Sequence, residues 1–194
     1  MKTKDLFESP QLINDLTVID IRLIQTECEN ILRANQAKVI HGFDKQTSLF
    51  KFEKSKNEGI YFLATDKNVD YACKYKKVEF FKTPSLIKSG ARQILIHRFA
   101  NASVYAVGIG ATIFWDYLFP EYSCLVSDIQ QTQDGKKFWE YRIKEAFEKN
   151  KTVRMINSEN KEYQDINTLE DLASLNSQIW GKTKWFQRII IVIF

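Results

Sequence analysis

The chain has 194 residues, of which 44% are hydrophobic and 27% are charged, a composition typical of folded globular proteins that excludes a largely disordered chain. This length suits one buried core, so we predict a single domain over residues 1–194. The formal net charge of +4 comes from 28 basic and 24 acidic residues interspersed along the chain, which permits nucleic acid as a partner but does not indicate it.

The first predicted element has two alternatives. Residues 19–23 alternate apolar and charged side chains, which is typical of a strand. Cys28 and Ile31 lie at helical spacing farther along, so a single helix from Pro10 onward fits nearly as well.

Four apolar runs between residues 48 and 99 predict a meander of short, antiparallel strands. Turn-forming Asn, Asp, Gly and Ser residues separate the runs. The predicted strands cover residues 49–52, 60–64, 69–81 and 93–99.

After residue 107 the spacing of apolar residues changes from two to about four. We expect an amphipathic helix over residues 108–119, ended by Pro120. A short buried strand at 122–126 follows, and a second helix runs from Thr132 to Lys149.

The remaining C-terminal residues predict three further elements. These are a strand at 152–156, a helix at 168–178 with Thr168 as its N-cap and Leu169 facing inward, and a buried isoleucine-rich strand at 189–194. The order of elements therefore predicts an α+β fold with a single mixed, mostly antiparallel sheet flanked by helices.

The cysteines and the apolar segments indicate in which part of the cell the protein is expected. Cys28, Cys73 and Cys124 are odd in number and widely spaced, and only two histidines accompany them, so neither a disulfide framework nor a metal site is expected. No segment approaches the roughly 20 apolar residues that a membrane span needs. We expect a cytoplasmic protein without a membrane partner. The terminal strand allows a homodimer by pairing between subunits.

The most informative motif is the G-x-G turn at Val107, Gly108, Ile109, Gly110 and Ala111, which follows a strand and opens a helix. Two glycines there let the backbone approach a ligand, and the first-turn amides favour a negatively charged group. A tight turn or close helix packing would explain the glycines equally well. The dinucleotide fingerprint requires a third glycine at position 113, which is isoleucine.

Antiparallel strands, this turn, a helix, a strand ending in a polar residue, and a second helix with an aromatic pair together resemble the GNAT acyltransferase family over residues 94–156. The resemblance implies that Val107, Gly108, Ile109, Gly110 and Ala111 hold the pyrophosphate of acetyl-CoA or another acyl-CoA. It also implies that the next strand parts from its neighbour to admit the pantetheine arm, and that an amine of a small molecule or protein accepts the acyl group.

The resemblance also implies roles for other residues, according to their positions in the motif. Ser127 and Asp128 end the strand beside the cofactor, which implies cofactor contact for Ser127 and substrate contact for Asp128, although Asp128 fits a helix cap equally well. Trp139, in the aromatic pair, is a candidate substrate contact; it stands where the family has a tyrosine general acid, and indole cannot supply that proton. Tyr141, two residues farther along, is the candidate for that catalytic acid if the helix is shifted. Tyr105 stands where the family usually has arginine or glutamine.

His97 and Glu79 are the candidate general bases. An imidazole on the last strand before the turn could deprotonate an amine near neutral pH, although a strand histidine is more often structural. Glu79, expected on the neighbouring strand, is the second candidate, or else a solvated charge.

Three functions are therefore open, in this order. The first is acyl-CoA-dependent N-acyl transfer. The second is a binding protein of the same fold that has lost catalysis, as Tyr105 and Trp139 would indicate. The third is a nucleic-acid-associated factor that uses the lysines between residues 74 and 82.

Overall fold

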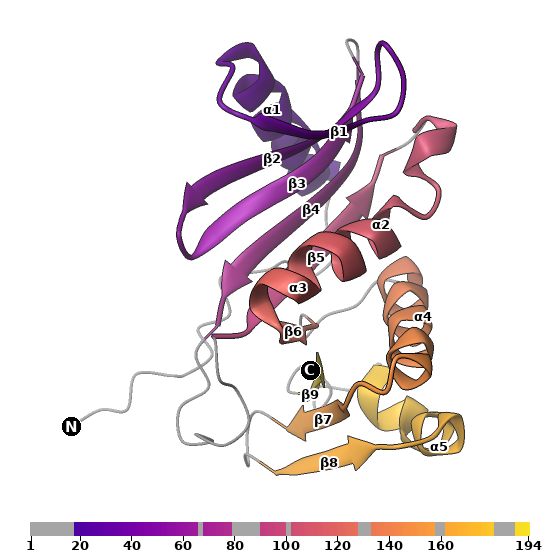
Figure 1. Cartoon of the computed structure of the whole chain (residues 1–194). Coiled ribbons are helices and arrows are strands. Elements are labelled where there is room, and N and C mark those ends of the chain that lie inside the picture. Colours follow the sequence, from indigo (N-terminus) through magenta and orange to yellow (C-terminus); the bar gives the residue numbers. More distant parts are fainter. Residues whose placement is uncertain are drawn as a thin grey trace, which may run out of the picture. The chain divides into compact units, whose positions relative to one another are not determined.

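The computed structural model describes residues 18–65, 68–78, 90–99, 102–127, 133–157, 162–180 and 189–194. The chain divides into two compact units (Figure 1). Unit 1 comprises Met1–Asp15, Val78–Gln93 and Tyr122–Phe194, and unit 2 comprises Leu16–Lys77 and Ile94–Glu121. One domain over residues 1–194 stays a prediction.

The strands of the described residues form a mixed sheet, in the hydrogen-bonded order β1-β2-β3-β4-β5-β6-β9-β7-β8. The α+β class is thereby confirmed. β5 and β6 are parallel, whereas the pairs β1/β2, β2/β3, β3/β4, β6/β9, β9/β7 and β7/β8 are antiparallel.

Unit 2 contains the meander that the apolar runs predict. Its strands are β1 (Lys38–Gly42), β2 (Ser48–Ser55), β3 (Glu58–Ala64), β4 (Val69–Lys77) and the larger part of β5 (Arg92–Arg98). The four predicted strands are confirmed, although the last residues of the predicted 69–81 strand lie outside the described residues. β1 was not predicted, because only two of its residues, Val39 and Ile40, are apolar.

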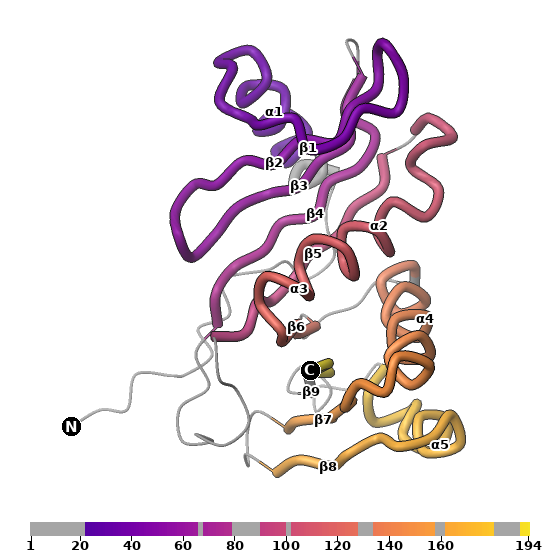
Figure 2. Tube along the Cα trace, in the orientation of Figure 1, coloured from indigo at the N-terminus to yellow at the C-terminus, as the bar shows by residue number. Residues whose placement is uncertain are grey.

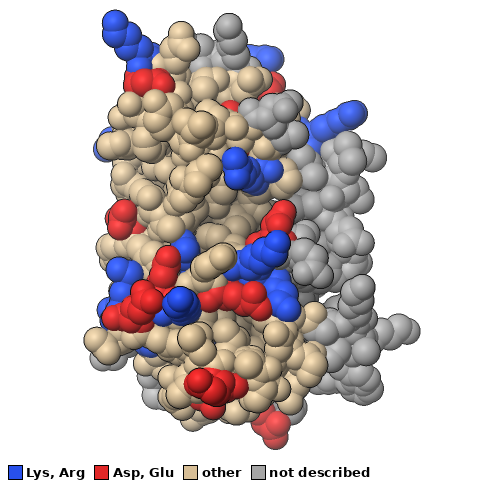
Figure 3. Space-filling view, turned by 90° about the vertical axis from the view of Figure 1, so that its right-hand side faces the viewer, with Lys and Arg blue, Asp and Glu red and all other residues tan. Residues whose placement is uncertain are grey.

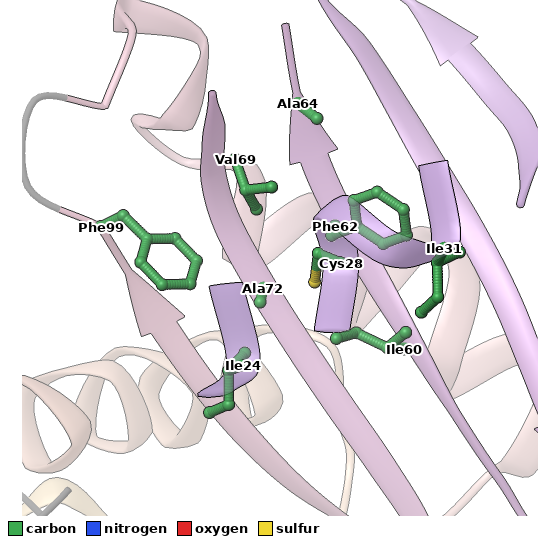
Figure 4. Packing of buried hydrophobic residues seen from close by; sticks show 9 residues of the cluster. All are labelled: Ile24, Cys28, Ile31, Ile60, Phe62, Ala64, Val69, Ala72 and Phe99. Carbon is green, nitrogen blue, oxygen red and sulfur yellow. The ribbon is translucent and has the colours of Figure 1, made fainter. Parts of the chain in front are cut away.

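The first element of unit 2 is the helix α1 (Val18–Arg33), so the helical alternative is correct and the strand alternative is wrong. Ile24, Cys28 and Ile31 recur at helical spacing and are buried against β3 and β4, with Phe62 and Ala72 among their neighbours (Figure 4). The free energy gained by burying these three side chains outweighs the local preference for a strand that the alternation at residues 19–23 indicates.

A second helical segment of unit 2 follows β5 and the short 3₁₀ helix η1 (Val104–Ala106). It runs without a break through α2 (Ile109–Thr112), the π-helical turn η2 (Ile113–Leu118) and α3 (Phe119–Tyr122) (Figure 2). The prediction that Pro120 ends this helix is wrong. The Phe119 N–H bonds the carbonyl of Phe114, five residues back, so the wider π-helical turn precedes the proline and accommodates its missing N–H.

The two helical segments of unit 2 lie on opposite faces of its sheet. α1 covers the face that carries Phe62 and Ala72. The α2–η2–α3 segment contacts the other face, where the ring of Tyr117 lies 5.8 Å from the ring of Tyr61 on β3. Because side chains alternate along a strand, this division assigns each strand residue to one of the two helices.

Unit 1 contains β6 (Leu125–Val126), β7 (Val153–Asn157), β8 (Tyr163–Ile166) and β9 (Ile189–Ile193), with the helices α4 (Gln133–Glu148) and α5 (Leu169–Trp180). The two predicted helices, the strand at 152–156 and the C-terminal strand are confirmed. β8 was not predicted, because Tyr163–Ile166 contains two polar residues.

Two local predictions in unit 1 need correction. The predicted strand at 122–126 is reduced to Leu125–Val126, because Tyr122 belongs to α3 and Ser123 has a left-handed φ of 55°. Leu169, expected to face inward, is 47% exposed, whereas Leu172 and Leu175 are buried. The Thr168 cap is confirmed, since its hydroxyl accepts the Asp171 N–H at 3.0 Å.

Candidate functional site

The glycine turn contains a glycine in the left-handed conformation. Gly108 has φ 76° and ψ −13°, a left-handed conformation that L side chains rarely adopt. Among the described residues, a Cβ placed on Gly108 would meet no atom within 4 Å apart from its chain neighbours, so there is open space at this one position.

The amides after Gly108 begin a helix without a side-chain cap. The Ala111 and Thr112 N–H groups bond the Gly108 carbonyl at 2.9 and 3.3 Å. The Ile109 and Gly110 N–H groups belong to the first turn, where no intrahelical acceptor exists. Val107 is 68% exposed, whereas Ile109 is buried, so Ile109 fixes the turn in the core while its neighbours face solvent.

Two carboxylates from the sheet contact the segment that leads into this turn. Oδ2 of the buried Asp70 accepts the Ser103 N–H at 3.2 Å, at the start of η1. The Asp44 carboxylate, in the β1–β2 turn, raises the pKa of Tyr105. The Tyr105 ring also packs on Phe43, with centroids 5.3 Å apart.

Hydrogen bonds explain the electrostatics of the Asp44 and Tyr105 pair. The Gln46 and Thr47 backbone N–H groups donate to the Asp44 carboxylate and lower its pKa, and the Tyr105 hydroxyl adds to this effect. The same carboxylate raises the pKa of Tyr105, because it favours the protonated phenol. Tyr105 is therefore a neutral phenol at neutral pH.

His97 lies on the α1 face of the unit 2 sheet. Leu95 and Phe99 lie two residues before and after His97, so all three side chains share one face of the strand. Leu95 and Phe99 pack in the core beneath α1, and the rings of His97 and Phe99 are 4.7 Å apart. Burial lowers the pKa of His97. His97 and the α2–η2–α3 segment therefore lie on opposite faces of the unit 2 sheet. The imidazole does not share a face with the helix that begins at the glycine turn.

The remaining sequence-predicted residues belong to unit 1. Ser127 is buried, and its Oγ accepts the Ile191 N–H of β9 at 2.9 Å. Trp139 is 1% exposed within the core, whereas the Tyr141 side chain faces solvent. Asp128 and Glu79 lie outside the described residues.

Across the part of the chain that the structure describes, no group of three or more His, Cys, Asp or Glu residues could hold a metal ion. Within the same residues, no helix combines the length and the apolar character needed to cross a membrane. No family model and no curated protein matches this chain. No matching protein therefore supplies site residues, and the candidate site rests on the geometry of this chain's own residues.

Asp44 and Asp70 were missed as site residues by the sequence analysis. Asp44 precedes Thr47 by three residues between two apolar runs, which is the pattern of a side chain that closes its own turn. That pattern predicts the turn but not the contact with Tyr105, 61 residues later. For Asp70, a charged residue inside an apolar strand was the available signal.

Proposed function

We propose that this protein binds an acyl-CoA through the glycine turn and transfers the acyl group to an amine. The observation that carries the proposal is the open, left-handed bend at Gly108, followed by the uncapped amides of Ile109 and Gly110. Backbone N–H groups and the positive end of the helix dipole together favour a phosphate group. A pyrophosphate suits this position because it offers several acceptor oxygens.

The strand that precedes the turn pairs briefly with β6. β5 pairs with β6 in parallel at only two positions, Arg92 with Leu125 and Gln93 with Val126, and β5 continues to Arg98 beyond them. The Gln93 side chain then donates to the Ser127 carbonyl at 3.3 Å.

In the proposed reaction, the amine nitrogen forms a bond to the thioester carbonyl carbon, and the carbon–sulfur bond breaks. The products are an amide and the thiol of CoA, which takes up the proton that the amine loses. The protein contributes by holding thioester and amine in contact. The face on which His97 lies argues against its serving as the base.

The second candidate is an acyl-CoA-binding protein without transfer activity. The observation in its favour is the burial of Trp139, since an indole enclosed in the core supplies no proton to a leaving thiolate. Both candidates use the same turn. They differ in whether binding is followed by release of free CoA.

A nucleic-acid-binding role has weaker support. In the view of Figure 3, Lys and Arg side chains are interleaved with Asp and Glu side chains. Lys74, one of the lysines expected to contact phosphates, forms an ion pair with Glu27 of α1 at 2.5 Å. A lysine held by a carboxylate is less available to a phosphate backbone.

Titration calorimetry with acetyl-CoA tests the proposal, using Gly108→Glu and the control Gly90→Glu. Gly90 has φ 70°, so both substitutions impose the same kind of backbone strain, and only the first introduces a carboxylate at the turn. We expect wild type and Gly90→Glu to bind and Gly108→Glu to lose at least about tenfold in affinity by charge repulsion.

Absence of heat from folded wild type at millimolar acetyl-CoA would remove the proposal, and so would equal loss in the two variants. A free-thiol assay with a panel of amines separates the two candidates. Release of CoA that depends on the amine supports transfer, and binding without release supports the binding protein.

A further inference from the structure

The strand β8 lies at one edge of the sheet, and one of its sides is free. Among the described strands, β8 pairs with β7 alone, and β1 is the strand at the other end of the order (Figure 1). A bulge between Val39 and His41 interrupts β1, whereas β8 pairs with β7 in a continuous register. Because a bulge hinders the addition of a further strand, β8 is the edge better suited to accept one.

The register of β7 with β8 shows which backbone groups face the free side. The Asn157 N–H bonds the Glu162 carbonyl at 2.9 Å, so these two residues form a hydrogen-bonded pair. Hydrogen-bonded and non-hydrogen-bonded pairs alternate in an antiparallel ladder, so Tyr163 and Asp165 direct their N–H and C=O groups away from β7. This edge therefore presents two donors and two acceptors to an added strand.

The side chains of the same two residues are held in place by one buried arginine. The Arg154 guanidinium lies 4.2 Å from the centroid of the Tyr163 ring, and its Nη2 donates to Oδ2 of Asp165 at 3.0 Å. An edge that is already ordered loses less conformational entropy when a further strand is added.

The charge around β8 indicates the chemistry of that further strand. From β8 to the end of α5, residues 162–180 contain no basic residue, in a protein whose net charge is +4; their acidic residues are Glu162, Asp165, Glu170 and Asp171. Of these, Asp165 is paired with Arg154. The same stretch carries two exposed apolar side chains, since Tyr163 is 53% and Leu169 is 47% exposed. Basic and apolar side chains on an added strand complement this edge.

We propose that the free edge of β8 binds an extended peptide with basic side chains, which joins the sheet as a further strand. Main-chain hydrogen bonds to Tyr163 and Asp165 give the affinity, and the carboxylates of residues 162–171 select for basic side chains. A second copy of this chain fits less well, because pairing β8 with itself brings two acidic edges together. The site uses none of the residues of the glycine turn and does not depend on acyl-CoA.

The test uses a fluorescein-labelled probe peptide of eight alternating lysine and valine residues, and fluorescence anisotropy measures its binding to the full chain. A probe with glutamate in place of lysine is the charge control. We expect the lysine probe to bind and the glutamate probe not to bind.

A pair of substitutions at one position isolates the main-chain hydrogen bond. Tyr163→Pro removes an N–H that faces away from β7, which an edge strand tolerates, and Tyr163→Ala removes the same ring but keeps the N–H. Tyr163→Pro should bind the lysine probe about three- to tenfold more weakly than Tyr163→Ala. Gly42→Pro, a proline on the edge strand β1, should bind like wild type. Circular dichroism checks that each variant is folded.

A second set of variants tests the charge. The double variant Glu162→Gln with Glu170→Gln should weaken binding of the lysine probe about two- to fivefold at low ionic strength, and added salt should remove the difference. Glu148→Gln, at an exposed carboxylate of α4 in unit 1, is the matched control and should bind like wild type.

Amide hydrogen exchange locates the bound probe. Exchange at Tyr163 and Asp165 should slow at least about fivefold with saturating probe, because their N–H groups gain acceptors, whereas exchange at Gly42 should not change. Binding without slower exchange at Tyr163 and Asp165 would overturn the proposal, as would equal binding of the two probes or no binding by folded wild type. A dimer in sedimentation velocity that Tyr163→Pro disrupts would assign this edge to a second copy and would also overturn it.

Discussion

The Lys51 ammonium lies 3.0 Å from Oε2 of Glu121, which joins the middle of β2 to the last turn of the helical segment that begins at the glycine turn. Glu53 contacts the same ammonium at 2.7 Å, and the Tyr61 hydroxyl lies 3.5 Å from Glu121 Oε2. Lys51 is partly buried, so the pair is less screened by solvent than an ordinary surface pair. It fixes the end of the helix that is remote from the candidate site.

We predict that Glu121→Gln lowers the free energy of unfolding by about 0.5–1 kcal/mol, since Glu121 is itself partly exposed. Glu53→Gln, at a more exposed carboxylate, should have a smaller effect. Urea denaturation measures both. Equal losses of unfolding free energy in the two variants would show that the ion pair between Lys51 and Glu121 of α3 adds no stability.

The same pair predicts a pH dependence. Burial acts to lower the pKa of Lys51, but hydrogen bonds to Glu53 and Glu121 outweigh it, and the net effect is a raised pKa. A raised pKa in the folded state stabilises the protein below the unfolded value of 10.5, and this stabilisation is lost as the pH rises above it. The stability of wild type should therefore fall more steeply above pH 10.5 than that of Glu121→Gln.

Gly59 leaves no room for a side chain. A Cβ there would lie 2.6 Å from the Phe52 carbonyl oxygen and 2.4 Å from the Tyr75 hydroxyl. We predict that Gly59→Ala destabilises the protein by about 2–3 kcal/mol, because backbone must move. At Gly42 the nearest atom would be 3.9 Å away, so Gly42→Ala is the control. A loss in thermal stability no larger than that of the control would contradict the packing at β2 and β3.

We predict that changing Asp165, the ion-pair partner of Arg154 in unit 1, strongly destabilises the protein. Its Nε and Nη2 donate to both carboxylate oxygens of Asp165, at 2.5 and 3.0 Å, and the guanidinium is buried against Tyr163. Asp165→Asn leaves a buried charge without its counterion and should cost about 2 kcal/mol. Arg154→Met, which removes the charge, should cost less. Calorimetric unfolding of both variants decides the order.

The three cysteines should be unreactive in the folded protein. Cys28, Cys73 and Cys124 are free and buried, and burial raises the pKa of each thiol to about 12. Iodoacetamide at pH 8 should therefore alkylate all three only after denaturation, as mass spectrometry would show. Because the folded state favours the neutral thiols, this contribution to stability falls as the pH rises above the unfolded value of 9.0. Rapid labelling of native protein would contradict the burial.

The candidate site was only partly predictable from the sequence. Gly108 and Gly110 were identifiable because a G-x-G between a strand and a helix constrains its own backbone. His97 was placed on the correct strand, but which face it occupies depends on which side α1 packs, and no local pattern encodes that. The ring of Tyr105 packs on Phe43, far away in the chain, and no local pattern in either segment predicts this contact.

The sequence by itself determined the elements whose signal is local: the four meander strands, the helices around Ile143 and Leu172, the Thr168 cap and the glycine turn. Periodicity, capping and glycine geometry act within a few residues, so they can be recognised without a fold. Only the tertiary structure decided that residues 18–33 form a helix, that β1 and β8 exist, and that Pro120 lies within a helix. These outcomes depend on burial and pairing with distant residues, whose free energy outweighs weak local preference.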